Sequence, residues 1–126
     1  MPDKIRVMLL DDSAMSLRFA RAYLEGLNFD VRTATSITEF HRIVGEFPPQ
    51  VILTDVEMPE ATGDEICRVL RRNIATAKIP IVFFSGLDAA ELSQRAQRAG
   101  ADGYVCKTAG PAALQEKLSV LLGNIH

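Results

Sequence analysis

Acidic, hydroxyl and lysine side chains follow four short apolar runs of this chain, and together these residue types can carry phosphoryl chemistry. Asp11-Asp12 follows residues 7–10, Thr54-Asp55 follows residues 51–53, Ser85 follows residues 81–84, and Lys107 follows residues 104–106. If the runs are parallel strands of one sheet, their carboxyl ends meet at one edge, where open α/β sheets bind ligands. The order of these residues therefore predicts a functional site at that edge.

Three of the carboxylates, those of Asp11, Asp12 and Asp55, are expected within a few ångströms of one another. Two unit charges ~4 Å apart repel by about 4 kcal/mol at an effective dielectric of about 20. The cluster therefore needs a positive charge, and Mg²⁺ fits best because it prefers oxygen ligands and retains water molecules. Lys107 supplies a second, movable positive charge.

A carboxylate held against magnesium, with a lysine and a hydroxyl nearby, can attack a phosphoryl group and become an aspartyl phosphate. Any one of the aspartates alone would be better explained as a cap of a helix or turn. That alternative does not readily explain the entire set. We therefore interpret the edge as both a binding site and a reactive site.

The rest of the chain must supply the elements that position these residues. Apolar runs of strand length alternate with segments of helical period, which is the pattern of repeated βαβ units. Residues 51–53 are apolar at consecutive positions, as expected of a central strand covered on both faces. The chain thus reads strand-helix five times, and right-handed crossovers would distribute the helices over both faces of a parallel sheet.

The apolar stripes of the expected helices differ in strength. In the third helix, Val69 is expected in the buried stripe and Arg71 mostly on the solvated side. The fourth helix has only a weak stripe, formed by Leu92, Ala96 and Ala99. The last helix has the clearest period, formed by Leu114, Leu118, Leu121, Leu122 and Ile125. We therefore expect the fourth helix to be the least firmly packed.

Composition narrows the function classes. The formal net charge of −2 and the lack of a long basic run give no reason to expect nucleic acid as a partner. The longest apolar runs are only a few residues, so neither a membrane segment nor a signal peptide is expected, and the cytoplasm is the default location. Cys67 and Cys106 lack metal-site spacing, and His41 and His126 are isolated, so no zinc site is expected.

These residues, in this order, resemble the receiver domain of bacterial two-component response regulators over essentially the full length of the chain. Asp11-Asp12 matches the family's acidic pair. The segment from Asp55 to Gly63, DVEMPEATG, matches the phosphoacceptor followed by Met-Pro and a downstream glycine. Three further family positions are matched: the hydroxyl residue by Ser85, the switch aromatic by Tyr104, and the lysine by Lys107.

The resemblance implies an α/β fold of the flavodoxin-like type, a doubly wound (βα)5 three-layer sandwich with a five-stranded parallel sheet in the order 2-1-3-4-5. Residues 1–126 would form a single receiver domain. It would accept a phosphoryl group from a histidine kinase or phosphotransfer protein on Asp55. It would not be an enzyme, because its chemistry would be limited to self-catalysed phosphoryl transfer and autodephosphorylation at Asp55.

The resemblance also implies how the domain signals. No output domain follows residue 126 of this sequence, so a stand-alone receiver similar to the chemotaxis regulators is expected. It would present a phosphorylation-dependent surface to an unknown downstream protein, through its fourth helix, fifth strand and fifth helix.

Site roles follow from the resemblance residue by residue. The implied Mg²⁺ ligands are Asp12, Asp55 and the backbone carbonyl of Glu57, with Asp11 assisting indirectly, often through water. The other implied roles are hydrogen bonding of the phosphoryl group by Ser85, ion pairing with it by Lys107, and switching by Ser85 together with Tyr104.

Three positions depart from the family pattern. Thr108 follows Lys107 where the family usually has proline and a cis bond, which before threonine would cost ~3 kcal/mol more than trans. The loop into the last helix is therefore expected to differ. Gly86 replaces the commoner alanine and would make its loop more pliable. Glu57 places an extra anion at the mouth of the site.

Two other functions remain open from the sequence. Asp55-Val-Glu57 loosely resembles the Asp-x-Asp of small phosphatases of the haloacid dehalogenase type. However, the chain has no room for their cap domain, and Asp11-Asp12 has no role there. The other alternative is a phosphorylation-independent adaptor with a relic site. The nearly complete acidic set argues against it, whereas Thr108 and Glu57 keep it open.

Overall fold

The computed structural model describes residues 4–59 and 61–123, in which five strands alternate with five helices. The strands are β1 (Arg6–Leu10), β2 (Asp30–Ala34), β3 (Val51–Thr54), β4 (Ile81–Ser85) and β5 (Gly103–Cys106). The helices are α1 (Ala14–Gly26), α2 (Ile37–Glu46), α3 (Gly63–Arg72), α4 (Ala89–Ala99) and α5 (Pro111–Leu122), with a 3₁₀ turn η1 (Lys107–Ala109) before α5. Ile125, which we predicted in the last helix, lies outside the described residues, as do Glu60 and His126.

The five strands form one parallel sheet in the order β2-β1-β3-β4-β5, which confirms the predicted fold class. Leu10 pairs with Thr54 across β1 and β3, and the amide of Asp55 donates to the carbonyl oxygen of Leu10 at 2.8 Å. Ser85 pairs with Cys106 across β4 and β5. This register aligns the carboxyl ends of neighbouring strands, after which the predicted site residues follow.

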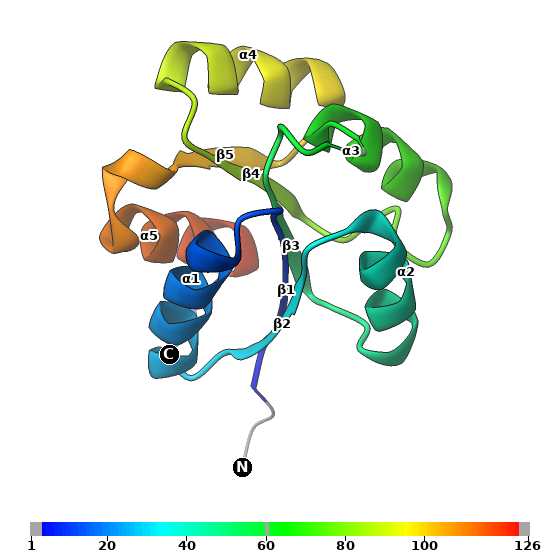
Figure 1. Ribbon diagram of the computed structural model, residues 1–126, viewed down its shortest axis with the longest axis horizontal. Coiled ribbons are helices and arrows are strands. Elements are labelled where there is room, and N and C mark those ends of the chain that lie inside the picture. Colours follow the sequence, from blue (N-terminus) through cyan, green and yellow to red (C-terminus); the bar gives the residue numbers. More distant parts are fainter. Residues whose placement is uncertain (1–3, 60, 124–126) are drawn as a thin grey trace.

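Helices cover both faces of the sheet (Figure 1). α1 and α5 lie on one face, and α2, α3 and α4 lie on the other. The core beneath α1 and α5 includes Leu17, Leu24, Leu114 and Leu118. The core beneath the other three helices includes Phe40, Ile66, Leu70 and Leu92. All four residues of β3 are buried, as the consecutive apolar run predicts for a strand between two helical layers.

Side-chain caps fix where the helices begin near the carboxyl edge. At the start of α1, the Oγ atom of Ser13 accepts a hydrogen bond from the backbone N–H of Ser16 at 3.2 Å. At the start of α3, Thr62 and Glu65 form a reciprocal capping box, and Asp88 caps α4. Each cap satisfies an N–H group that has no partner within its helix. The first turns of these helices therefore begin next to the strand ends.

Two of our expectations for α3 are wrong. Val69 is 51% exposed, whereas Cys67 is fully buried in the apolar stripe, so the helix is rotated relative to the predicted face. Arg71 is not on the solvated side. Its guanidinium donates to two backbone carbonyls of the connection to β4 and, at 2.6 Å, to the carboxylate of Asp102. Arg71 thus supplies hydrogen-bond partners for the carbonyl groups of Ala77 and Ile79 in that connection.

Local residue preferences account for the end of α4 and the start of α5. α4 buries Leu92, Ala96 and Ala99 and ends at Gly100, which adopts the left-handed conformation at φ 80°. α5 begins at Pro111, whose fixed φ suits the first helical position. Within residues 4–59 and 61–123, no helix has the length and apolar character needed to cross a membrane.

Candidate functional site

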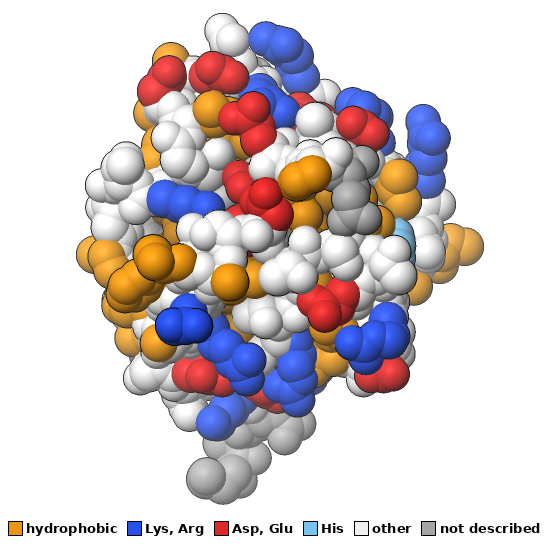
Figure 2. Space-filling view, in the orientation of Figure 1, with side chains coloured by type: hydrophobic (Ala, Val, Ile, Leu, Met, Phe, Trp, Pro, Cys, Tyr) orange, Lys and Arg blue, Asp and Glu red, His pale blue; other side chains and the backbone are white. Residues whose placement is uncertain are grey.

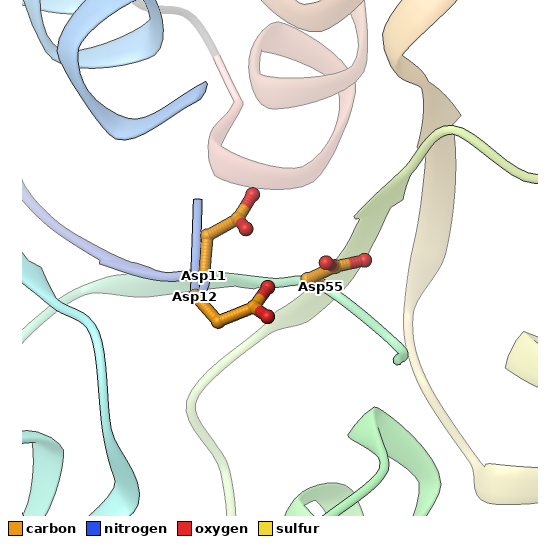
Figure 3. A group of neighbouring side chains, drawn as sticks. All are labelled: Asp11, Asp12 and Asp55. Carbon is orange, nitrogen blue, oxygen red and sulfur yellow. The ribbon is translucent and has the colours of Figure 1, made fainter. Parts of the chain in front are cut away.

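Three aspartates meet at the carboxyl edge of the sheet (Figure 3). Asp11 and Asp12 follow β1, Asp55 follows β3, and one carboxylate oxygen of each lies within 4.8 Å of the others. Asp11 is buried, Asp55 is half-buried and Asp12 is exposed. Figure 3 shows the Asp12 carboxylate directed toward Asp55, whereas that of Asp11 is directed toward α5. The predicted carboxylates are thus brought together by the strand register.

The environment of Asp55 disfavours its charged form. Burial raises the pKa of the Asp55 carboxyl, and the negative charge of Asp11 raises it further. The charge of Lys107 and hydrogen bonds from the backbone N–H groups of Val56 and Glu57 lower it, but the net direction is upward. The Val56 bond is 2.8 Å long. An additional positive charge at this position would therefore stabilise the carboxylate.

Lys107 lies beside the cluster but pairs with Asp11. Its Nζ donates to Oδ2 of Asp11 at 2.6 Å and to Oγ of Ser16 at 3.1 Å. The Asp11 side chain is 6% exposed and that of Lys107 is 23% exposed, so the pair is well shielded from water. Such charge-assisted hydrogen bonds are roughly twice as strong as neutral ones. Ser16, in the first turn of α1, was not among the residues that we predicted at the site.

The loop that follows β5 contains no cis peptide bond. The bond before Thr108 is trans, as are all peptide bonds of the described ranges. Lys107 begins the 3₁₀ turn η1, and Gly110 then adopts φ 92°, in the region that favours glycine. The chain therefore enters α5 through a tight turn and a glycine.

Ser85 is buried at the end of β4, with 3% of its surface exposed. Its Oγ accepts a hydrogen bond from the backbone N–H of Leu87 at 3.2 Å. A hydroxyl that accepts one bond still has its proton to donate to another group. The next residue, Gly86, is exposed, and a Cβ atom there would meet nothing within 4 Å.

Tyr104 lies on β5, where it pairs with Phe83 of β4. Its ring is half-buried and packs against the core beneath α2, α3 and α4. On its other side, the Nζ atom of Lys117 lies 5.9 Å from the ring centroid, within the range of a cation–π contact. Tyr104 therefore stands at the boundary between the core and the surface of α5.

The loop after Asp55 is held tightly by the start of α3. The backbone N–H of Gly63 donates to the carbonyl oxygen of Val56 at 2.8 Å, and Glu57 forms an isolated bridge with Thr62. A Cβ atom on Gly63 would lie 2.8 Å from the carbonyl oxygen of Asp55 and 2.9 Å from the Cα of Val56. Only glycine permits so close an approach of two backbones. The downstream glycine therefore fixes the loop that carries Asp55.

Figure 2 shows acidic side chains near the centre of one face of the molecule and apolar side chains gathered at its left side. Met15 and Phe19 of α1 are 69% and 71% exposed.

Carboxylate oxygens, as in the group of Asp11, Asp12 and Asp55, are the ligands that Mg²⁺ prefers, and their combined negative charge suits a divalent cation. The donor set therefore fits magnesium.

Comparison with known proteins identifies the family. Residues 7–119 match the sequence family described as "Response regulator receiver domain". The chain belongs to this family. The match runs from β1 into α5, and it confirms the resemblance that the acidic pair, the Asp55 segment and the lysine indicate.

Relatives of this receiver domain differ greatly in length from one another. It is 35% identical over 104 residues to the gliding motility regulatory protein of Myxococcus xanthus, which is 82% of this chain but only 13% of that protein. It is 25% identical over 122 residues to the chemotaxis protein CheY1 of Helicobacter pylori (strain ATCC 700392 / 26695), which is 95% of this chain and 98% of that protein. The same domain thus occurs within much longer proteins and in proteins of about this size.

A solved structure shows the same fold. The receiver domain superposes on chemotaxis protein CheY4 of Vibrio cholerae with a TM-score of 0.84 and 26% sequence identity, covering 93% of this chain and 98% of that one. The flavodoxin-like, chemotaxis-regulator-like architecture is therefore confirmed. Receiver domains are in general signalling domains of two-component systems rather than enzymes, and they bind Mg²⁺ at an acidic pocket.

Proposed function

We propose that this receiver domain accepts a phosphoryl group on Asp55 from a histidine kinase or phosphotransfer protein, in the presence of Mg²⁺. The observation that carries the proposal is the meeting of three carboxylates within 4.8 Å, with the Lys107 ammonium bound to one of them. A structural cap would need only one such carboxylate. The raised pKa of Asp55, caused first by burial, further supports a site that gains from a bound cation.

Asp12, Asp55 and the backbone carbonyl of Glu57 would hold the metal, and Asp11 would assist through water. Held there, Mg²⁺ would supply positive charge to the phosphoryl oxygens during transfer. Asp12 is exposed and Asp55 half-buried, so the ligands are open to an ion from solution. Glu57 is also exposed, and its side chain adds negative charge at the entrance without joining the three-aspartate group.

In the transfer step, a carboxylate oxygen of Asp55 forms a bond to phosphorus. The bond between phosphorus and the imidazole nitrogen of the donor breaks, and its electron pair returns to that nitrogen. Lys107 leaves Asp11 to pair with a phosphoryl oxygen, and the Ser85 hydroxyl donates to another. Hydrolysis of the resulting acyl phosphate by water restores Asp55, so the domain carries out self-catalysed transfer and autodephosphorylation without processing a separate substrate.

Phosphorylation adds negative charge at one point, and the domain must carry that change to a partner. Ser85 and Tyr104 lie on β4 and β5, beneath α4 and beside α5. If Ser85 moves toward the phosphoryl group, the space next to it changes and Tyr104 takes a more buried position. The surface formed by α4, β5 and α5 would then be presented to the downstream protein.

Intact mass measurement tests the proposal. The protein is incubated with acetyl phosphate and MgCl₂, and a single phosphate-sized mass increase is expected for the wild type and none for Asp55→Asn. Chelation of magnesium with EDTA should also prevent the increase. An adduct on Asp55→Asn would assign the acceptor to another residue. A wild type without an adduct would favour the phosphorylation-independent adaptor.

A further inference from the structure

Arg95 of α4 lies where three elements near the acceptor meet. Its guanidinium contacts the carboxylate of Asp64 twice, with Nη2 at 2.7 Å and Nε at 3.2 Å from Oδ1. Nη2 also lies 3.4 Å from the carbonyl oxygen of Val56. One side chain thus joins α4 to the first turn of α3 and to the residue that follows Asp55.

The Arg95–Asp64 pair is largely shielded from solvent. The two side chains are 19% and 20% exposed, whereas the ion pair of Arg21 with Glu25 has side chains 46% and 47% exposed. Pairing with the Asp64 carboxylate raises the pKa of Arg95, so the guanidinium stays charged. Shielded pairs are screened less by salt than surface pairs. This pair therefore has more influence on structure than the exposed pairs of the molecule.

The carbonyl of Val56 is the point at which the contacts converge. It accepts the backbone N–H of Gly63 at 2.8 Å in addition to the longer contact from Arg95. Gly63 in turn presses against the backbone of Asp55, and Asp64 is the next residue of α3. A displacement of the loop after Asp55 must therefore alter the hydrogen bonds of Arg95, which is a residue of α4.

The buried apolar side chains of α4 are those of Leu92, Ala96 and Ala99, two of which are small. Two further acidic groups face the guanidinium, because Glu91 lies 4.0 Å away and Glu57 acts on it at longer range. Arg95 therefore has acidic neighbours on α3, on α4 and in the loop after Asp55. Alternative pairings among them would give the discrete arrangements that a conformational switch requires.

We propose that Arg95 is a positioning residue that holds the loop following Asp55 against α4 and passes movements of that loop to the helix. The second part of this inference rests on the proposed function, since it assumes that a phosphoryl group on Asp55 moves the loop. The first part concerns the unphosphorylated protein alone. The two parts are therefore tested separately.

The first test compares amide NMR spectra of variants without metal or phosphodonor. Arg95→Ala and the milder Asp64→Asn should both shift the amides of residues 56–58 and 63. Arg98→Ala is the matched control, since Arg98 lies on the same helix, is exposed and bonds only to Gln94 of α4 in the described contacts. Arg95→Lys keeps the charge but not the paired contact, so it should give intermediate shifts. Unchanged amides at residues 56–58 in both Arg95→Ala and Asp64→Asn would overturn the positioning role.

The second test adds Mg²⁺ and beryllium fluoride, a phosphoryl mimic, to the same variants. The shifts induced in residues 89–99 should fall to less than half of the wild-type value in Arg95→Ala and remain unchanged in Arg98→Ala. Full shifts of α4 in Arg95→Ala would contradict the coupling. A wild-type protein that does not respond to the mimic would overturn the proposed function and the coupling with it, whereas the first test decides the positioning role independently.

Discussion

Helices α4 and α5 flank the same strand, β5, but they are attached to the sheet in different ways. α5 buries Leu114 and Leu118, and Leu121 and Leu122 of the same helix pack against that core. α4 buries one leucine and two alanines, and it gains the shielded ion pair of Arg95 with Asp64. Burial of a leucine contributes about 1.5–3 kcal/mol, and an alanine contributes much less.

The difference indicates which helix can respond to the site. Apolar contacts of large side chains are lost only by opening the core, which is costly. A polar contact can be exchanged for another at small net cost, because each partner can bond elsewhere. We therefore expect α4 to move when the loop after Asp55 changes conformation, and we expect α5 to remain in place. The following predictions test this contrast, beginning with the largest effect.

Leu118→Ala should destabilise the protein by about 2–5 kcal/mol, because it removes a fully buried side chain of α5 and leaves a cavity. Urea unfolding followed by circular dichroism measures the loss. Val120→Ala is the control on the same helix, since Val120 is 72% exposed, and it should change stability by less than about 0.5 kcal/mol. If the two variants lost equal amounts of stability, the buried leucines would not be what holds α5 against the sheet.

Gly63→Ala should cost about 1–3 kcal/mol, because the added Cβ would lie 2.8 Å from the carbonyl oxygen of Asp55. The loop must then shift, so the affinity for Mg²⁺ should fall as well. Gly86→Ala is the matched control, because a Cβ atom there meets nothing within 4 Å. Thermal unfolding and a magnesium titration measure both effects. If Gly63→Ala changed stability and magnesium affinity no more than Gly86→Ala does, the loop after Asp55 would not depend on this close approach.

Asp55→Asn should raise the melting temperature at pH 7 in EDTA. Burial and the charge of Asp11 raise the folded-state pKa of Asp55 above its unfolded value, so ionisation of this carboxyl costs stability at neutral pH. The gain should shrink as the pH falls through the folded-state pKa, where the wild-type carboxyl becomes neutral. A gain that is the same at pH 7 and pH 4 would contradict this explanation.

Ser16→Ala should have the smallest effect. Lys107 loses one of its two hydrogen bonds and keeps the one to Asp11, so it is held in place less strongly. Removal of one hydrogen bond is worth about 0.5–1 kcal/mol, so release of Lys107 toward the acceptor should strengthen binding of beryllium fluoride about two- to fivefold. Fluorine NMR measures the affinity. In a Lys107→Ala background the same substitution should change nothing, and an effect that persisted there would exclude action through Lys107.

Much of the fold and of the candidate site could be predicted, because both depend on local patterns. The order of the strand ends predicts that Asp11, Asp12 and Asp55 meet, and β3 is recognisable from its unbroken apolar run. Ser13, a residue type that is favoured at helix N-termini, caps α1. These features follow from nearest neighbours in the chain and from the geometry of parallel strands.

The contacts that could not be predicted join residues far apart in sequence. Arg95 and Asp64 are separated by 31 residues, and Lys107 and Ser16 by 91, so no spacing rule connects them. The exposure of Val69 depends on how α3 is rotated against its neighbours. Such details are decided by packing between elements rather than by the pattern within one element.

The account is tested most directly by amide NMR of the wild-type protein, titrated with Mg²⁺ and beryllium fluoride. Residues 55–58 should shift most, residues 86–106, which include α4, should follow, and α5 (Pro111–Leu122) should shift least. Ser85→Ala should still bind the mimic at Asp55 while its shifts in residues 86–106 are smaller. If α5 shifted more than α4, or if the largest shifts lay away from Asp55, the proposed acceptor and its connection to α4 would be contradicted.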